Sequence, residues 1–455
     1  MRNQLSNRGF SLVEMMIAIA VGAIMMIALV VIASDTLATA RVQDGSARLQ
    51  ENGRYALSRI RRDIHQMLYF PISSVQKRLP RADDSPSAIA PGGGVFLNAT
   101  PKTIVSFLNP ATPQLGFGPA GLTTLHGGGQ AEYHIPPNYL LAAHECGAST
   151  CDPALTIPQA AYPNVPASGT AAGARMPNTD VLTSRFLTSF GVRVSQDSLA
   201  GYPVPGAPNA GIRLENGMDP ALPPLNLVNG DPVLVASSTA VAAFSATIVP
   251  GGIAALAGGG NLNPIGGLSF ESTAATRELE ARVYNLRDGF EVVSYYVRLK
   301  ADPNRPGRLI GTLVRQVGSQ VEELIEGVER FDLRFGVEGN AGVRYMNAAE
   351  LYSRMGGTIG CPAAPDRDPA SAYNDATMGC LWRNVGSIEV SLLLNTIDDL
   401  PVSGNEPYRY SAASTAPTAT PLLDPGVSPP SPLPAGSMLR REFRETIQMK
   451  NGNGS

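Results

Sequence analysis

Arg8-Gly9-Phe10-Ser11-Leu12-Val13-Glu14 begins an apolar run that continues to Ala33. Arg2 and Arg8 precede the run, and Glu14 is its single charged residue. As a helix the run would be roughly 36 Å long, enough to cross a hydrocarbon core of about 30 Å. The positive-inside bias then predicts a cytoplasmic leader and a body of the chain on the far side of the membrane.

Two simpler interpretations of this run are a cleaved secretory signal and a plain signal anchor. The run is longer than the apolar region of a secretory signal, and no clear small-x-small cleavage site ends it. A plain anchor accounts for the length. It leaves Glu14 unexplained, because an unpaired carboxylate within an apolar segment is unfavourable and indicates a partner.

The segment Gly9–Glu14, placed between a short basic leader and an apolar run, resembles the class III signal of type IV pilins and pseudopilins. The resemblance implies that a prepilin peptidase cuts after Gly9 and methylates the new amino group of Phe10. It also implies that Glu14 faces the N-terminal ammonium of a neighbouring subunit. Such an arrangement is physically reasonable, since charges removed from water are tolerated when they are paired.

The helix is predicted to continue beyond Ala33 as an amphipathic segment, because apolar residues recur at close to heptad spacing. These residues are Val42, Leu49, Ala56, Leu57, Ile60, Ile64, Met67 and Leu68. The charged residues that fall largely off this stripe are Arg48, Arg54, Arg59, Arg61, Arg62 and Asp63. We interpret the arginines as a solvated face, with a binding patch as the alternative. Gly45 and Gly53 are expected to weaken the helix by about 1 kcal/mol each, and Pro71 to end it. The pattern predicts one long helix whose second half packs on a globular domain.

The bulk composition favours a β-rich, loop-rich body. The chain has 455 residues, 47 of them glycine and 38 proline, with 6% aromatic residues, which favours strands, turns and long loops. Its length suggests two or three structural units. Charged residues make up 16% and the net charge is −3, so no electrostatic signature of nucleic-acid binding is present.

The four cysteines form two local pairs, Cys146 with Cys151 and Cys361 with Cys380. Export would permit disulfides, and the local pairing is the simplest of three connectivities. No metal or other cofactor is predicted. The spacing of His134, His144 and Glu145 around the first pair matches no zinc pattern. The carboxylates between the second pair, Asp366, Asp368 and Asp375, lack the spacing of a calcium-binding EF-hand.

Strands are predicted wherever β-branched or apolar runs lie between turn residues. In the first half of the body these runs are Thr103–Leu108, Val181–Phe186, Pro232–Ser237 and Val241–Val249. In the second half, an antiparallel meander is expected from Ala281–Leu286, Glu291–Leu299 and Leu309–Val314, with a hairpin connection at Asp302–Gly307. Gln320–Gly327 is predicted to form a short helical turn before a half-buried strand at Val328–Val337. Pro401–Gly436 is predicted to be extended and exposed.

Several segments, in order along the chain, resemble the PilW minor pilins and the related J-type pseudopilins of type II secretion. They are Asn52–Leu57 with Arg62–Ile64, Asn178–Thr183, Asn229–Val235, Tyr295–Val297, Leu324–Val328, Val385–Leu394 and Leu439–Asn451. The resemblance implies an α+β, type IV pilin-like fold with a long N-terminal helix packed on an antiparallel β-sheet domain. The loop between Cys361 and Cys380 resembles the cystine-closed loop of many pilins. Insertions around residues 80–175 and 250–270 depart from the family core.

The expected division of the chain follows from these segments. Residues 1–9 are a leader, 10–33 a membrane-spanning and assembly half of the helix, and 34–70 its amphipathic half. Residues 71–275 are a loop-rich β region, and 276–455 hold the sheet and the C-terminal cystine loop.

The resemblance implies a minor pilin in the inner membrane, crossing it once with its C-terminal domain in the periplasm, that is assembled into a type IV pilus. Its expected partners are the prepilin peptidase, other minor pilins, the major pilin and a PilY-type tip adhesin. A J-type pseudopilin of type II secretion and a signal-anchored periplasmic enzyme are the alternatives. The sequence has no nucleophile elbow and no HExxH motif, so we expect no enzymatic activity.

Overall fold

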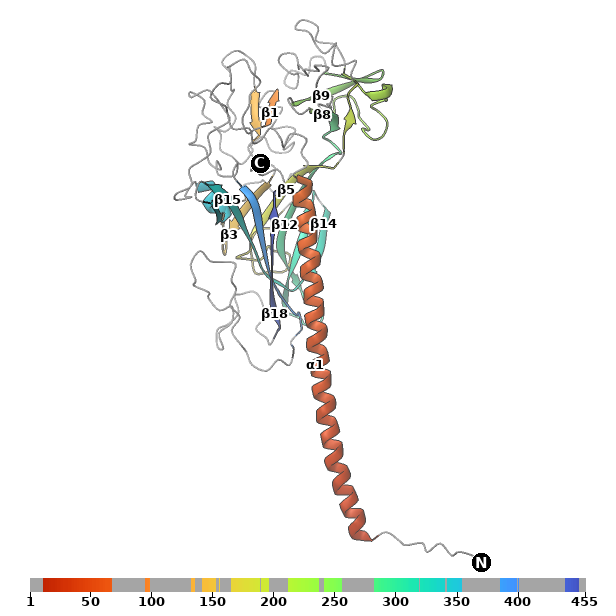
Figure 1. The fold of residues 1–455 in the computed structure, drawn as a ribbon, viewed down its shortest axis with the longest axis vertical. Helices are drawn as coiled ribbons and strands as arrows, with labels where there is room; N and C mark the ends of the chain where they lie inside the picture. Colours follow the sequence, from red (N-terminus) through yellow and green to blue (C-terminus); the bar gives the residue numbers. More distant parts are fainter. Residues whose placement is uncertain are drawn as a thin grey trace, which may run out of the picture.

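In the computed structural model, a long helix projects from a β-rich body that is gathered around one end of it (Figure 1). The structure describes residues 11–67, 95–98, 132–135, 141–152, 155, 165–188, 190–195, 212–236, 241–255, 282–318, 320–339, 342–353, 385–398, 400 and 438–449. Among these residues the secondary structure is one long helix, a short helix and antiparallel sheets. The predicted α+β fold with a long N-terminal helix on an antiparallel sheet domain is confirmed.

Helix α1 spans Leu12–Met67 without interruption and has two unlike halves. Side chains from Leu12 to Leu37 are exposed, whereas Leu49, Ala56, Leu57, Ile60 and Ile64 are buried in the main core. The predicted stripe therefore marks the face that packs on the body. Pro71, predicted to end the helix, lies outside the described residues.

Two antiparallel sheets form the body around the second half of α1. The first sheet has the strand order β14-β13-β12-β5-β3-β4, and the second sheet has the order β16-β15-β17-β18. The first consists of β3 (Leu141–Cys146), β4 (Cys151–Asp152), β5 (Val181–Leu187), β12 (Phe290–Ala301), β13 (Leu309–Val317) and β14 (Gln320–Glu326). The second consists of β15 (Val328–Gly339), β16 (Gly342–Met346), β17 (Val385–Asn395) and β18 (Arg440–Gln448), with the short helix α5 (Ala348–Ser353) after β16.

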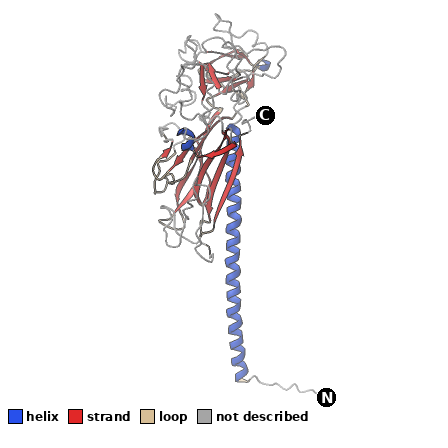
Figure 2. Ribbon diagram, turned by 60° about the vertical axis from the view of Figure 1, so that its left-hand side comes forward, coloured by secondary structure: helices blue, strands red, loops and turns tan. Residues whose placement is uncertain are grey.

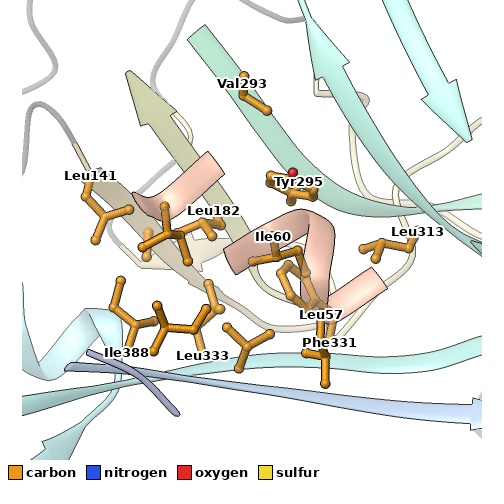
Figure 3. Close-up of a cluster of buried hydrophobic side chains, with 14 of the residues drawn as sticks. Leu57, Ile60, Leu141, Leu182, Val293, Tyr295, Leu313, Phe331, Leu333 and Ile388 are labelled. Carbon is orange, nitrogen blue, oxygen red and sulfur yellow. The ribbon is translucent and has the colours of Figure 1, made fainter. Parts of the chain in front are cut away.

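The end of α1 lies between these two sheets (Figure 3). Ile60 and Leu57 of the helix point into a cluster with Tyr295 of the first sheet and Phe331 of the second. All four side chains are buried and belong to one continuous core. Since each buried aliphatic or aromatic side chain contributes roughly 1.5–3 kcal/mol of transfer free energy, this core holds the helix firmly on the body.

A third sheet lies at the end of the body farthest from the N-terminus (Figures 1 and 2). Its strand order is β6-β11-β8-β9-β10-β7. The strands are β6 (Val192–Arg193), β7 (Ile212–Arg213), β8 (Pro232–Ala236), β9 (Val241–Val249), β10 (Gly252–Ala255) and β11 (Arg282–Asn285), with the 3₁₀ helix η1 (Glu215–Gly217) after β7. A separate hairpin pairs β1 (Val95–Asn98) with β2 (Glu132–Ile135).

Two expectations for the second half of the chain are wrong. Gln320–Glu326 is the strand β14, not a helical turn, because it pairs along the edge of β13. The three-strand meander is wrong in its first member, since β11 pairs with β8 and β6 and does not pair with β12. The β12–β13 pairing, with the connection at Asp302–Gly307, agrees with the prediction.

The two glycines expected to weaken α1 lie where the body approaches the helix most closely. A Cβ on Gly53 would lie 2.6 Å from the ring of Phe443 in β18, and one on Gly45 would lie 3.0 Å from the Thr396 methyl group. Glycine therefore admits the C-terminal strand against the helix backbone. The loss of helix propensity is accompanied by a packing contact that no larger residue would permit.

Candidate assembly interface

The N-terminal half of α1 is an apolar surface that the described part of the body does not cover. This half is long and apolar enough to cross a membrane, and none of its most apolar 18-residue stretch is buried. Large side chains such as Ile17, Ile24, Met26 and Ile32 are exposed. A surface of this kind is unfavourable in water and is stabilised by lipid or by other apolar helices.

Glu14 forms a capping box at the start of α1. The Ser11 backbone N–H donates to Glu14 Oε2 at 3.1 Å, and the Val13 N–H donates to Ser11 Oγ at 3.3 Å. Two of the helix's free N–H groups are thereby satisfied, and the negative charge lies at the positive end of the helix dipole. Gly9 and Phe10, the predicted cleavage and methylation positions, lie outside the described residues. The pairing of Glu14 with a neighbouring ammonium stays a prediction.

Asp63 joins the other end of α1 to the first sheet. Its carboxylate is 1% exposed and accepts hydrogen bonds from the Tyr295 hydroxyl at 2.7 Å and from Arg315 Nε at 2.6 Å. Burial and the nearby Asp63 charge raise the pKa of Tyr295 above its ordinary value. Burial acts to lower the pKa of Arg315, but its hydrogen bond to Asp63 and the Asp63 charge outweigh burial and raise that pKa. Asp63, which the heptad pattern places largely off the apolar stripe, is therefore buried all the same.

Two arginines flank this buried pair and bind the two sheets separately. Arg59 contacts Glu322 of β14 at 3.5 Å, and Arg61 contacts Glu445 of β18. Glu322 also lies 3.7 Å from Arg315, which extends the Asp63 network to the surface. The helix is thus held between the outer strands of both sheets by charge as well as by apolar packing.

The other predicted face charges behave as expected. Arg48, Arg54 and Arg62 are exposed, and Arg48 forms an i,i+4 pair with Asp44 at 3.0 Å. Exposed pairs of this type contribute about 0.3–0.5 kcal/mol. They fit a solvated face.

Asp180 connects the two sheets on the side near β3. Its carboxylate accepts the backbone N–H of Cys146 at 3.2 Å and that of Leu333 at 2.8 Å. Burial, together with the charges of Glu145 and Asp332, raises its pKa well above the usual range. Burial and the Asp332 charge also raise the pKa of Glu145 to about 7. Both carboxyl groups therefore keep their proton up to a higher pH than ordinary acids do.

Cys146 and Cys151 form a disulfide that closes the β3–β4 turn. Both cysteines are thus oxidised here. In the described part of the chain, no group of three His, Cys, Asp or Glu side chains is placed to hold a metal. Cys361, Cys380 and the carboxylates Asp366, Asp368 and Asp375 lie outside that part, as does the predicted strand Thr103–Leu108.

Two matches to family models agree with this geometry. Residues 5–32 match the prokaryotic N-terminal methylation motif, and residues 294–451 match PilW, described as type IV pilus-assembly protein W. The C-terminal part of the chain, residues 294–451, is thus similar to PilW. Comparison with curated proteins and with solved structures gave no significant match.

The PilW match covers the sheet side of the contact that holds α1 on the body. It begins within β12 and includes Tyr295 and Arg315, the partners of Asp63. The methylation motif covers the first, exposed part of α1. Asp63 itself and the strands β6–β11 lie outside both matches.

Proposed function

We propose that this protein is a PilW-type minor pilin of a type IV pilus. The observation that carries the proposal is the division of α1 into an exposed apolar half and a half buried between two sheets. The first half is suited to lipid before assembly and to a bundle of like helices afterwards, because both environments remove apolar surface from water. The second half fixes the body to the helix, so the position of the helix in the bundle sets the position of the body.

In this proposal the prepilin peptidase cuts between Gly9 and Phe10 and methylates Phe10. The single-pass protein resides in the inner membrane with its C-terminal domain in the periplasm. It then joins other minor pilins in a priming or tip complex that contacts the major pilin and a PilY-type adhesin. Its role is assembly, carried by helix packing and by charge neutralisation at Glu14, and not catalysis.

The proposal is tested first by the mature N-terminus. The full chain is co-expressed with a prepilin peptidase, and its N-terminal peptide is determined by mass spectrometry. We expect a chain that starts at an N-methylated Phe10, and an uncut chain for the matched variant Gly9→Val. A cut near Ala33, or an uncut wild-type chain, contradicts the proposal.

The second test separates the pilus from a secretion system. The gene is deleted, and surface pili, twitching motility and exoprotein secretion are measured, with the wild-type gene restored as the control. Loss of pili and twitching with normal secretion supports the minor pilin. Loss of secretion with intact pili would assign the protein as a J-type pseudopilin instead.

A further inference from the structure

The chain between β5 and β12 is an insertion into a hairpin. β5 and β12 are neighbours in the first sheet, with Leu187 opposite Phe290. The Thr188 N–H donates to the Gly289 carbonyl at 2.8 Å, directly beyond the last paired residues. The residues at which the inserted segment leaves and re-enters the first sheet are thus hydrogen-bonded to each other. A two-residue turn would connect the same two strand ends.

The strands of the insertion close on themselves as a small barrel. The sheet runs from β6 to β7, and these two end strands meet through a bridge between Val194 and Leu214. The Ser195 N–H adds a bond to the Arg213 carbonyl at 2.9 Å. Closure satisfies the end strands that an open sheet would leave as unpaired edges.

This barrel has its own core. The buried residues inside it form a cluster separate from the main core: Val192, Val194, Ile212, Leu214, Leu225, Leu227, Val233, Val235, Ala246, Ile253 and Val283. Among the barrel-strand side chains that the structure describes, Leu234 and Tyr284 are the two that belong to the main core. A separate core with few shared side chains is the property expected of a unit that folds by itself.

The barrel also lies away from the elements assigned to assembly. It sits at the end of the body opposite the exposed half of α1 (Figures 1 and 2). The contacts that hold α1 come from other elements, including Tyr295 of β12 and Phe443 of β18. Loss of the barrel would therefore leave the helix contact intact.

We propose that the segment between Thr188 and Gly289 is an inserted barrel module that folds separately from the pilin core and is not required for helix-driven assembly. The assembly part of this inference rests on the proposed pilin function, and the folding part does not. The module is an accessory surface at the outer end of the subunit.

Two matched glycine variants test the folding part. A Cβ on Gly252 would collide with the Ile212 carbonyl oxygen across the β10–β7 pair, and one on Gly311 would collide with the Val328 carbonyl oxygen in the pilin core. Each alanine therefore disturbs one unit through a backbone clash. Hydrogen exchange followed by mass spectrometry on the full chain in detergent reports both units at once.

We expect Gly252→Ala to speed exchange in β6–β11 by about tenfold or more and to leave β12–β18 and α1 near wild-type rates. Gly311→Ala should give the reverse pattern. Equal acceleration of both units in Gly252→Ala would overturn separate folding. If that variant fails to accumulate, a chain with residues 189–288 replaced by Asn-Gly decides the question, and its failure to accumulate also overturns the proposal.

Incorporation into sheared pili tests the assembly part. We expect Gly252→Ala to be recovered with pili at the wild-type level and Gly311→Ala to be lost from them. Loss of Gly252→Ala from pili that contain the wild-type chain would overturn this part. Absence of the wild-type chain itself from pili would instead contradict the proposed function, and the exchange result would still stand.

Discussion

The two halves of α1 have similar secondary structure and opposite surroundings. From Leu12 to Leu37 the helix exposes its apolar side chains on every side. From Leu49 to Ile64 it buries one face between two sheets and keeps the other charged. The difference follows from composition, because a helix that is apolar all round needs an apolar environment, whereas an amphipathic helix needs only one covered face.

The comparison also applies to the acidic residues. Glu14 lies in the exposed half and is satisfied within its own first turn. Asp63 lies in the buried half and is satisfied by the first sheet through Tyr295 and Arg315. Glu14 is exposed, whereas Asp63 is buried and committed to the fold. Variants at the two positions should affect assembly and stability respectively.

The largest effect on incorporation into pili is expected from Glu14→Ala. We expect cleavage by the prepilin peptidase to remain largely intact, because the cleavage point lies N-terminal to the helix. Incorporation into pili should fall by about an order of magnitude or more, since a charge pair in an apolar bundle would lose one partner. Quantitative immunoblots of sheared pili measure this incorporation. As a control, denaturant unfolding should show that the body of the variant is as stable as that of the wild-type chain. Normal incorporation would contradict the pairing argument.

Asp63→Asn is expected to destabilise the body by up to about 3 kcal/mol, because the buried Arg315 guanidinium loses its nearer carboxylate and keeps only the partly exposed Glu322 at 3.7 Å. Denaturant unfolding of the full chain in detergent, followed by circular dichroism, measures the change. The matched control is Asp44→Asn, because the Asp44 side chain is 63% exposed and pairs with Arg48 on the same helix face. That control should change stability by less than about 0.5 kcal/mol. Similar losses in both variants would remove the distinction between the helix faces.

Asp63 shows how far periodicity alone could predict the site. The heptad stripe found Leu49, Ile60 and Ile64, all of which are buried. It placed Asp63 outside because a heptad describes a narrow face, whereas a helix packed between two sheets buries a wider one. The signal that could have found it is position, since Asp63 is three residues after Ile60 and adjacent to Ile64. Its basic and hydroxyl partners lie more than two hundred residues away in the sequence.

The strands divide in the same way into those predicted from local pattern and those set by distant pairing. β9 and β15 are predicted closely because long apolar or alternating runs mark them. β14 was missed since Gln320–Glu326 contains good helix formers, and only its pairing with β13 makes it a strand. Strands as short as β6 and β7 have no detectable period. Closure of the barrel therefore could not be predicted from sequence.

Gly53→Ala and Gly22→Ala compare the two halves of α1 with one chemical change. A methyl group at Gly53 would meet the Phe443 ring, whereas nothing lies within 4 Å of one at Gly22. Overpacking at Gly53 should destabilise the body by about 1–3 kcal/mol despite the better helix propensity. Gly22→Ala should leave unfolding of the body unchanged. Equal stability of the two variants would indicate that β18 does not pack on the helix backbone.

The smallest effect is expected in the pH dependence of the stability of the body. The pKa of Glu145 is raised to about 7 in the fold from an ordinary value of 4.5, so the folded state holds this proton more tightly than the unfolded chain does. Its contribution to stability is fully present below about pH 4.5 and is lost as the pH rises through about 7. We expect a loss of roughly 1–2 kcal/mol between pH 5 and 8, less than the full shift of about 1.4 kcal/mol per unit, because the group is partly exposed. Glu145→Gln should reduce this loss and leave the part that comes from Asp180, whose pKa burial also raises, whereas Glu14→Ala, in the exposed half of the helix, should leave the profile unchanged. A profile that Glu14→Ala alters would show that the two halves of α1 are coupled through the body.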